Sequence, residues 1–252
     1  MTFDVAAERY DAFMGRWSRL LAPALADLAG VATSTRVLDV GCGTGMLTAE
    51  LVRRAGAACV AAADPSAPFV AAMRQRFPDV ETSQAPAEAL PYEDGRFDAA
   101  LAQLVVHFLP DPVRGLGEMR RVTRAGGVVA ACVWDFGGGR GPLGPFWAVA
   151  RELRPDADDE RERPGTHEGQ LAALFVEAGI ADVSATALDV TLDLPGFDAW
   201  WEPFTFGVGP AGQLVASLDD ADRDWLREGC RRRLPDGPFQ LTARAWAACG
   251  EA

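Results

Sequence analysis

Apolar side chains recur along this chain with two periods, and these periods predict where helices and strands lie. Between residues 4 and 29 they recur every three or four positions, as on one face of an amphipathic helix. Pro23 lies inside this stretch and is expected to divide it into two helices, and Gly30 is expected to end the second. Residues 1–30 are therefore predicted to form a helical cap.

After the cap, short apolar runs alternate with helical periods. The runs predict strands at residues 36–40, 59–63, 80–82, 97–103 and 128–134, and helices are expected at 46–55, 67–77 and 112–122. Further along, a helix is expected at 168–178 and strands at 183–192 and 239–249. Alternating strands and helices form a mostly parallel sheet with helices on both faces. The pattern thus predicts an α/β fold with a Rossmann-like, doubly wound, seven-stranded sheet.

The same pattern predicts one domain that spans residues 1–252. Its core covers residues 31–134, and the regular alternation then stops in a segment rich in Gly, Pro and charge at 135–165. A second irregular, helical and aromatic-rich segment covers residues 195–236. Ligand sites of doubly wound sheets lie beyond the carboxyl ends of the strands. We therefore expect these two insertions to select the substrate.

Charge and composition exclude several kinds of chemistry. The net charge is -12, all 24 basic residues are Arg, and the chain contains neither Lys nor Asn. Lys-based chemistry is therefore excluded, and the acidic balance argues against a nucleic-acid partner. No apolar run is long enough to span a membrane, and the five cysteines form no CxxC pair. We expect a cytoplasmic monomer or homodimer without a zinc site or disulfide.

A glycine-rich turn follows the first predicted strand. The segment 37–45 reads VLDVGCGTG, and its GxGxG spacing differs from the GxGxxG fingerprint of nicotinamide-dependent dehydrogenases. It resembles the first motif of class I S-adenosylmethionine-dependent methyltransferases, of the bacterial small-molecule, UbiE-like (methyltransferase-11) type. Four other parts of the chain follow in that family's order: residues 63–66, 87–92, 97–98 and 118–127. The resemblance covers roughly residues 10–190.

This resemblance implies that S-adenosylmethionine is the cofactor and S-adenosylhomocysteine its product. Asp39 would hold the cationic amino group of the cofactor, or else it caps the turn. Asp64 would accept hydrogen bonds from the ribose hydroxyls, or else it caps the next helix. The other positions carried over as cofactor-binding are Gly41, Cys42, Gly43, Gly45, Pro65, Ala87, Glu88 and Gln103.

One position departs from the family pattern. Family members often carry an Asp immediately before the Ala87-Glu88 pair, where it binds the adenine amino group, and this chain has Pro86 there. Adenine recognition is then expected to depend on the backbone near Ala87 and on Glu88.

The sequence offers one candidate catalytic base. His107 lies in an apolar stretch after the fourth predicted strand, and an ordinary imidazole titrates close to neutral pH. It could remove a proton from the acceptor, contact the cofactor or acceptor, or pack in the core. The pattern of the metal-dependent methyltransferases needs Lys and Asn, so no metal is expected.

Aromatic side chains gather in two places that are candidate walls for an acceptor. Trp200, Trp201 and Phe204 lie in the second insertion, and Tyr10, Phe13 and Trp17 lie in the cap. They would bind an apolar ligand, or pack the insertion and cap onto the domain. We predict an enzyme of secondary metabolism that methylates a small, largely apolar or aromatic acceptor on O, N or C, by positioning the reactants in line. The alternative is an enzyme of the same fold that binds this cofactor but catalyses a non-methylating reaction of a natural-product intermediate.

Overall fold

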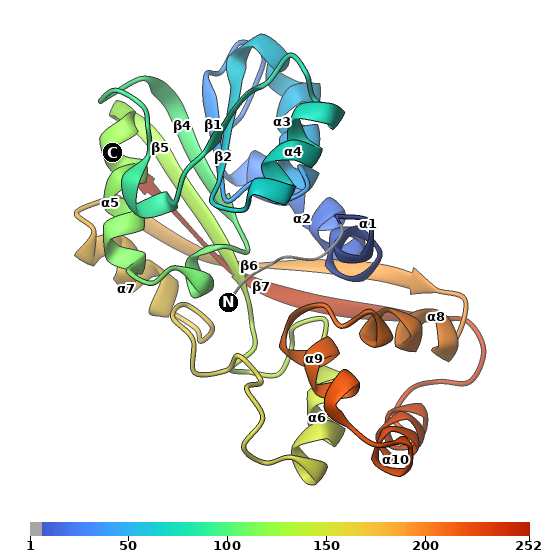
Figure 1. The fold of residues 1–252 in the computed structure, drawn as a ribbon. Coiled ribbons are helices and arrows are strands. Elements are labelled where there is room, and N and C mark those ends of the chain that lie inside the picture. The colour runs from blue at the N-terminus through green and yellow to red at the C-terminus, as the bar shows by residue number, and fades with distance from the viewer. Residues whose placement is uncertain (1–6) are drawn as a thin grey trace.

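A seven-stranded mixed sheet forms the centre of the molecule (Figure 1). The structure is a computed structural model that describes residues 7–252. The strand order is β3-β2-β1-β4-β5-β7-β6; the first five strands are parallel, and β7 is antiparallel to both β5 and β6. The strands are β1 Val37–Val40, β2 Val60–Asp64, β3 Glu81–Gln84, β4 Phe97–Gln103, β5 Thr123–Trp134, β6 Ala181–Leu194 and β7 Phe239–Glu251.

Helices cover both faces of this sheet. Helices α2 and α3 bury their apolar sides on one face, and α5 and α7 bury theirs on the other. The helices are α1 Ala7–Tyr10, α2 Arg16–Leu28, α3 Met46–Ala55, α4 Ala67–Arg76, α5 Pro112–Val122, α6 Gly144–Leu153, α7 Gln170–Glu177, α8 Phe197–Trp201, α9 Gly209–Ser217 and α10 Asp220–Arg231. A π-helical turn, Asp11–Gly15, joins α1 to α2, and short 3-10 turns are Ala57–Cys59, Ala87–Ala89, Val106–Phe108 and Glu202–Phe206.

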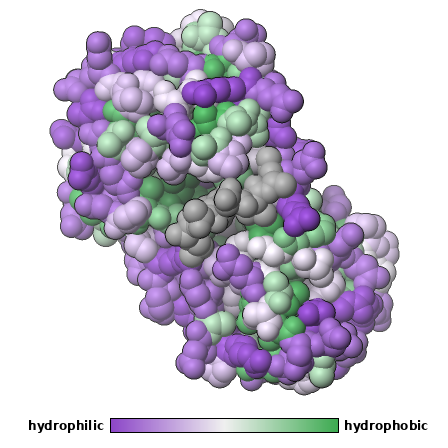
Figure 2. Space-filling view, in the orientation of Figure 1, coloured by the Kyte–Doolittle hydropathy of each residue, from purple (hydrophilic) through white to green (hydrophobic). Residues whose placement is uncertain are grey.

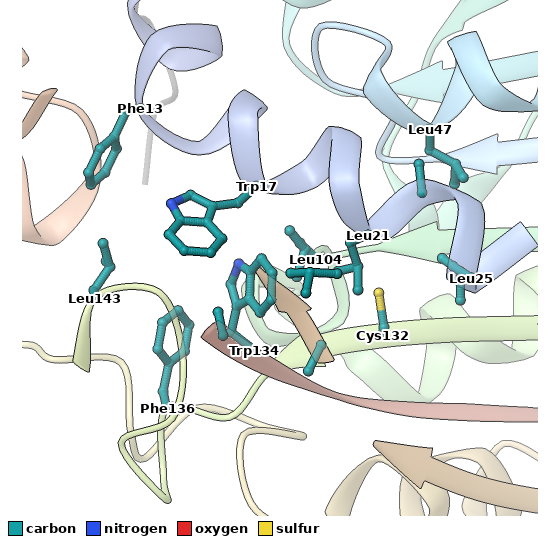
Figure 3. Close-up of a cluster of buried hydrophobic side chains, with 14 of the residues drawn as sticks. Phe13, Trp17, Leu21, Leu25, Leu47, Leu104, Cys132, Trp134, Phe136 and Leu143 are labelled. Carbon is teal, nitrogen blue, oxygen red and sulfur yellow. The ribbon is translucent and has the colours of Figure 1, made fainter. Parts of the chain in front are cut away.

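The apolar strands are buried because both faces of the sheet are covered. Every residue of β1 and β2 is buried, and α2 lays Trp17, Leu21 and Leu25 over β5 (Figure 3). The ring of Trp17 meets that of Trp134 edge-on, with centroids 6.4 Å apart. Strand β6 lies at the edge of the sheet and exposes much of its length.

The predicted fold class is confirmed, and three elements agree with the structure to the residue: α3, β4 and α5. The prediction that Pro23 divides the first helix is wrong, because Pro23 lies inside the continuous helix α2. Pro23 is on the exposed side of α2, where water can satisfy the carbonyl that loses its hydrogen bond, while Leu21 and Leu25 are buried. Strand β5 also begins earlier than predicted and runs through Gly126 and Gly127. Residues 4–6 of the predicted helix lie outside the described residues.

The two insertions add helices at one end of the sheet. Helices α6, α8, α9 and α10 lie together near the ends of β6 and β7 (Figure 1). The cap contacts them: Arg16 Nη1 donates to the carbonyl of Ala199 at 2.9 Å, and the Phe13 ring meets that of Phe204 at 5.2 Å. Hydrophilic side chains cover most of the face shown in Figure 2. No helix among the described residues is long and apolar enough to cross a membrane.

Candidate active site

A cavity of about 550 Å³ opens at the carboxyl ends of β1, β2 and β4. Strand β1 lies between β2 and β4, so the chain runs outward in opposite directions from this point. Doubly wound sheets bind ligands in the crevice at such a reversal, and the volume suits a nucleoside-sized ligand. Predicted residues in its wall are Gly41, Gly43, Asp64, Pro65, Ala87, Glu88 and Gln103.

The glycine-rich turn brings backbone, rather than side chains, to this cavity. Gly41 and Gly43 have φ of +70° and +53°, a left-handed conformation that glycine adopts without strain. A Cβ on Gly41 would collide with the Val105 side chain, whereas a Cβ on Gly43 would meet nothing within 4 Å. The space above Gly43 is therefore free for a ligand to approach the main chain.

Two other predicted positions of the turn shape it without lining the cavity. Gly45 has φ of +90°, and a Cβ there would collide with Met73 and Phe77. The N–H of Cys42 donates to the carbonyl of Ala63 at 3.1 Å, and burial raises the pKa of its thiol. Both residues hold the turn between β1 and α3 in the described structure.

Asp64 presents a carboxylate to the cavity. Its Oδ2 accepts from the N–H of Gly43 at 2.9 Å, and its Oδ1 accepts from the N–H of Ser66 at 2.8 Å. Burial raises the pKa of Asp64 above its usual value, while these two bonds oppose the rise. Each carboxylate oxygen can accept two hydrogen bonds, so each keeps one free site. The N-cap of α4 is Ser66, so Asp64 does not take the capping role.

Gln103 presents an unpaired acceptor in the same wall. Its Nε2 donates to the carbonyl of Ser18 at 2.9 Å, which fixes the side chain against α2. Its Oε1 is buried and has no hydrogen-bond partner among residues 7–252. A buried acceptor without a donor is costly, so this atom fits an ammonium group of a ligand.

Asp39 lies deeper in the sheet, behind the cavity wall. Its Oδ2 accepts from Thr48 Oγ1 at 2.5 Å, which ties β1 to α3. Burial raises the pKa of Asp39 to about 7, and the bond to Thr48 opposes the rise. The side chain does not line the cavity, so its observed role is to join strand and helix.

Another part of the cavity wall comes from the start of the 3-10 turn Ala87–Ala89. Pro86, Ala87 and Glu88 line it, and Glu88 Oε1 accepts from the N–H of Asp111 at 3.3 Å. The position that resembles an adenine-binding site thus lies in the cavity wall, with Glu88 as its carboxylate.

A second, smaller cavity of about 40 Å³ adjoins the first, and we call it the annex. Tyr10, Leu104 and Phe108 line both cavities, so these side chains lie at the boundary between them. The rest of the annex wall is mainly apolar, and its polar members are His107, Trp134 and Glu160. His107 Nδ1 and Trp134 Nε1 are buried without a hydrogen-bond partner among the described residues. An apolar space with a few convergent polar groups is typical of a small-molecule site.

The environment of His107 weakens it as a base. Burial and the positive charge of Arg163 lower the pKa of His107 to about 3, so the ring is neutral at pH 7. The structure therefore gives no support to the prediction that His107 removes a proton from the acceptor. A neutral imidazole in this place can still exchange hydrogen bonds with a ligand.

The predicted aromatic walls divide into two groups. Tyr10 and Phe13 line the annex. Trp17, Trp200, Trp201 and Phe204 line neither cavity and lie in the hydrophobic core, where the Phe204 ring stacks on Phe146 at 4.6 Å. These four side chains therefore pack in the core, which is the alternative that the sequence left open for them.

Hydrogen bonds tie the cap to the glycine-rich turn. Asp11 accepts from Thr44 Oγ1 and, at 2.8 Å, from Arg76 Nη2. Arg76 Nη1 in turn donates to the carbonyl of Thr44 at 2.6 Å. These bonds hold the segment that carries Tyr10 over both cavities.

Comparison with known proteins agrees with this geometry. A family model described as "Methyltransferase domain" matches residues 38–131. A demethylmenaquinone methyltransferase of Mycobacterium sp. (strain KMS) is 40% identical over 138 residues, which cover 52% of this chain and 56% of that protein. This chain thus spans little more than half the length of that relative.

Two further matches cover most of the chain. An uncharacterized protein of Mycobacterium tuberculosis (strain ATCC 25618 / H37Rv) is 30% identical over 246 residues, covering 87% of this chain and 83% of that protein. A solved structure described as a methyltransferase from an antibiotic biosynthesis pathway of Anabaena variabilis ATCC 29413 has a TM-score of 0.63 and 18% identity. It covers 91% of this chain and 98% of that chain, and at this identity the likeness concerns the fold.

Proposed function

Because this chain belongs to the class I S-adenosylmethionine-dependent methyltransferases, we propose that it methylates a small, largely apolar or aromatic metabolite. The observation that carries the proposal is the adjacency of the two cavities. The larger one has the size and the polar groups for the cofactor, and the annex meets it across three shared side chains.

The residues of the larger cavity fit the cofactor group by group. Asp64 has one free acceptor site on each oxygen, which matches the two ribose hydroxyls. The unpaired Oε1 of Gln103 suits the ammonium group, and the open space over Gly43 admits the chain between them. Pro86, Ala87 and Glu88 would surround the adenine ring.

The annex would receive the reacting end of the acceptor. Its volume, about 40 Å³, holds roughly three water molecules, so it suits one edge of a ring or a short group. Tyr10 and Phe13 would cover that edge from the cap, while the neutral His107 and the N–H of Trp134 offer it hydrogen bonds. The relatives named as demethylmenaquinone methyltransferases act, by name, on a quinone, and a quinone is a largely apolar ring compound of the kind proposed here.

When bound, the cofactor supplies an activated methyl group, so this chain need not supply a nucleophile. Its residues hold the two reactants in line and keep water out. Positioning of this kind can lower a barrier by roughly 7–11 kcal/mol. The shared wall of Tyr10, Leu104 and Phe108 is the part of the protein where the two reactants would meet.

The test is to incubate the protein with methyl-labelled S-adenosylmethionine and a panel of phenols, naphthols, aromatic amines and quinols. We expect label in the acceptor and one S-adenosylhomocysteine per product. Converted acceptor without S-adenosylhomocysteine would instead support a non-methylating reaction. If calorimetry shows no binding of S-adenosylhomocysteine, the assignment of the larger cavity is wrong.

A further inference from the structure

Glu160 places a carboxyl group in the wall of the annex. It lies between α6 and α7, in the charged segment 158–163, and its side chain is buried, with 4% of the residue exposed. Its φ is +66°, a left-handed conformation that is uncommon for residues other than Gly, Asn and Asp. The backbone therefore takes a strained turn at the position that directs this side chain into the annex.

The neighbouring residue, Asp159, is a buried carboxylate with a structural role, and its contacts differ from those of Glu160. Asp159 accepts from Arg161 Nε at 2.7 Å and from Arg151 Nη1 at 3.0 Å, and its pKa is lowered. Among residues 7–252, Glu160 has no such pair of hydrogen bonds. Its ion pair with Arg163 joins Nη1 to Oε1 at 3.7 Å, while Arg163 Nη2 donates to Asp158 at 2.7 Å.

Charged and titratable groups surround Glu160 from several elements. They are Arg163, Asp158 and Asp159 in its own segment, His107 after β4, and Tyr10 in α1. Burial raises the pKa of Glu160 to about 7, and Arg163 opposes the rise. A carboxyl group that titrates near the working pH is suited to accept a proton during a reaction.

The charge of Arg163 also limits which acceptors fit beside Glu160. It already lowers the pKa of His107, so a cationic ammonium in the annex would meet the same repulsion. A neutral hydroxyl group avoids this repulsion, and an anion that develops on its oxygen is stabilised by Arg163. The geometry therefore favours a phenol or enol over a protonated amine.

We propose that Glu160 is the general base of this enzyme and takes the proton from the hydroxyl group of a phenolic or enolic acceptor. This inference rests on the proposed function. As the acceptor's bond to the methyl carbon forms, the bond from that carbon to sulfur breaks, and its electron pair stays on sulfur as a neutral thioether. The hydroxyl proton passes to Glu160, which later releases it to water.

The experiment compares the wild type with Glu160→Gln, and uses Glu162→Gln as the matched control because Glu162 is exposed two residues away. Calorimetry first measures the affinity for S-adenosylhomocysteine, which should be equal in all three proteins. The loaded proteins are then titrated with 4-methylphenol, which keeps its hydroxyl proton at about pH 8, and with 4-methylanisole, which has none; Glu160 is ionised at this pH. We expect 4-methylphenol to bind about tenfold more weakly to Glu160→Gln than to the wild type, because a charge-assisted hydrogen bond is lost. The anisole should bind both alike.

A second readout uses turnover of 1-naphthol and 1-naphthylamine. For the wild type, log kcat/KM with 1-naphthol should rise with pH and level off near the pKa of Glu160, about 7. Glu160→Gln should lose this inflection and about 10²–10⁴ in kcat/KM, while the neutral amine, which attacks without prior deprotonation, changes far less.

The outcomes separate the two proposals. If the wild type binds S-adenosylhomocysteine but binds 4-methylphenol no better than Glu160→Gln does, or not at all, the role of Glu160 is refuted and the cofactor site stands. If the wild type does not bind S-adenosylhomocysteine, the proposed function fails and this inference fails with it.

Discussion

Replacement of Asp64 tests the assignment of the larger cavity most directly. Its two oxygens already accept the N–H groups of Gly43 and Ser66, at 2.9 and 2.8 Å. One acceptor site remains on each oxygen, and together they would take the two ribose hydroxyls. A hydrogen bond to a charged group contributes about 1.5–3 kcal/mol. Loss of both in Asp64→Ala should therefore cost at least about 3 kcal/mol, a loss of affinity of roughly a hundredfold.

The Asp64→Asn variant should bind nearly as poorly. One of its two positions becomes an NH₂ group, which would face the N–H of Gly43 or of Ser66 and can accept nothing. Calorimetry with S-adenosylhomocysteine measures the effect, and Asp79→Asn, on the exposed turn after α4, is the control. An affinity of Asp64→Ala within about threefold of the wild type would refute the placement of the ribose, provided that thermal unfolding shows a folded protein.

Three further changes have definite expected results. Gly41→Ala should weaken binding of S-adenosylhomocysteine and lower Tm, because its φ is +70° and Val105 occupies the space, whereas Gly117→Ala in α5 should raise Tm slightly, since nothing lies within 4 Å. The pKa of Asp39 rises from 3.8 to about 7 on folding, so its protonation stabilises the protein at low pH, and about 4 kcal/mol is lost as pH rises from about 4 to 7. Urea unfolding across that range should show a smaller fall for Asp39→Asn. Asp11→Asn breaks a partly exposed ion pair, so global stability should change by less than about 1 kcal/mol while hydrogen exchange in α1 accelerates.

Local sequence patterns were enough to predict much of the fold. They show what a residue does to its own helix or strand, but not what surrounds that residue in the folded chain. Helix α5 was predictable because Pro112 begins it and its apolar positions recur with a helical period. The prediction at Pro23 was wrong because the sequence shows which residue removes a helical hydrogen bond, but not whether water can replace that bond. Only the burial of Leu21 and Leu25 beside an exposed Pro23 explains why α2 continues.

The site was predictable only where a residue's role is fixed by the turn that carries it. The glycine-rich turn and Asp64 follow strands directly, so their place at the carboxyl edge could be expected from the sequence. The lowered pKa of His107 could not, because it depends on burial of the ring and on the charge of Arg163, which lies in another part of the chain. Glu160 gave no signal either, since six charged residues in a row look like solvated surface until the fold buries one of them.

The buried carboxyl groups among the described residues differ in the hydrogen bonds and ion pairs that stabilise them. This difference distinguishes acids with a structural role from acids that face a ligand. Burial of a carboxylate is unfavourable unless hydrogen bonds or opposite charges stabilise it. Asp135 and Asp159 each accept hydrogen bonds from arginine, and Asp39 accepts one from Thr48. Within residues 7–252, Asp64 is bound only by backbone N–H groups, and the side chain of Glu160 only by an ion pair at 3.7 Å. Because these last two are also the ones that line a cavity, their unused acceptor sites are directed to ligands. Removal of Asp135 or Asp159 should therefore act on stability, and removal of Asp64 or Glu160 on binding and turnover.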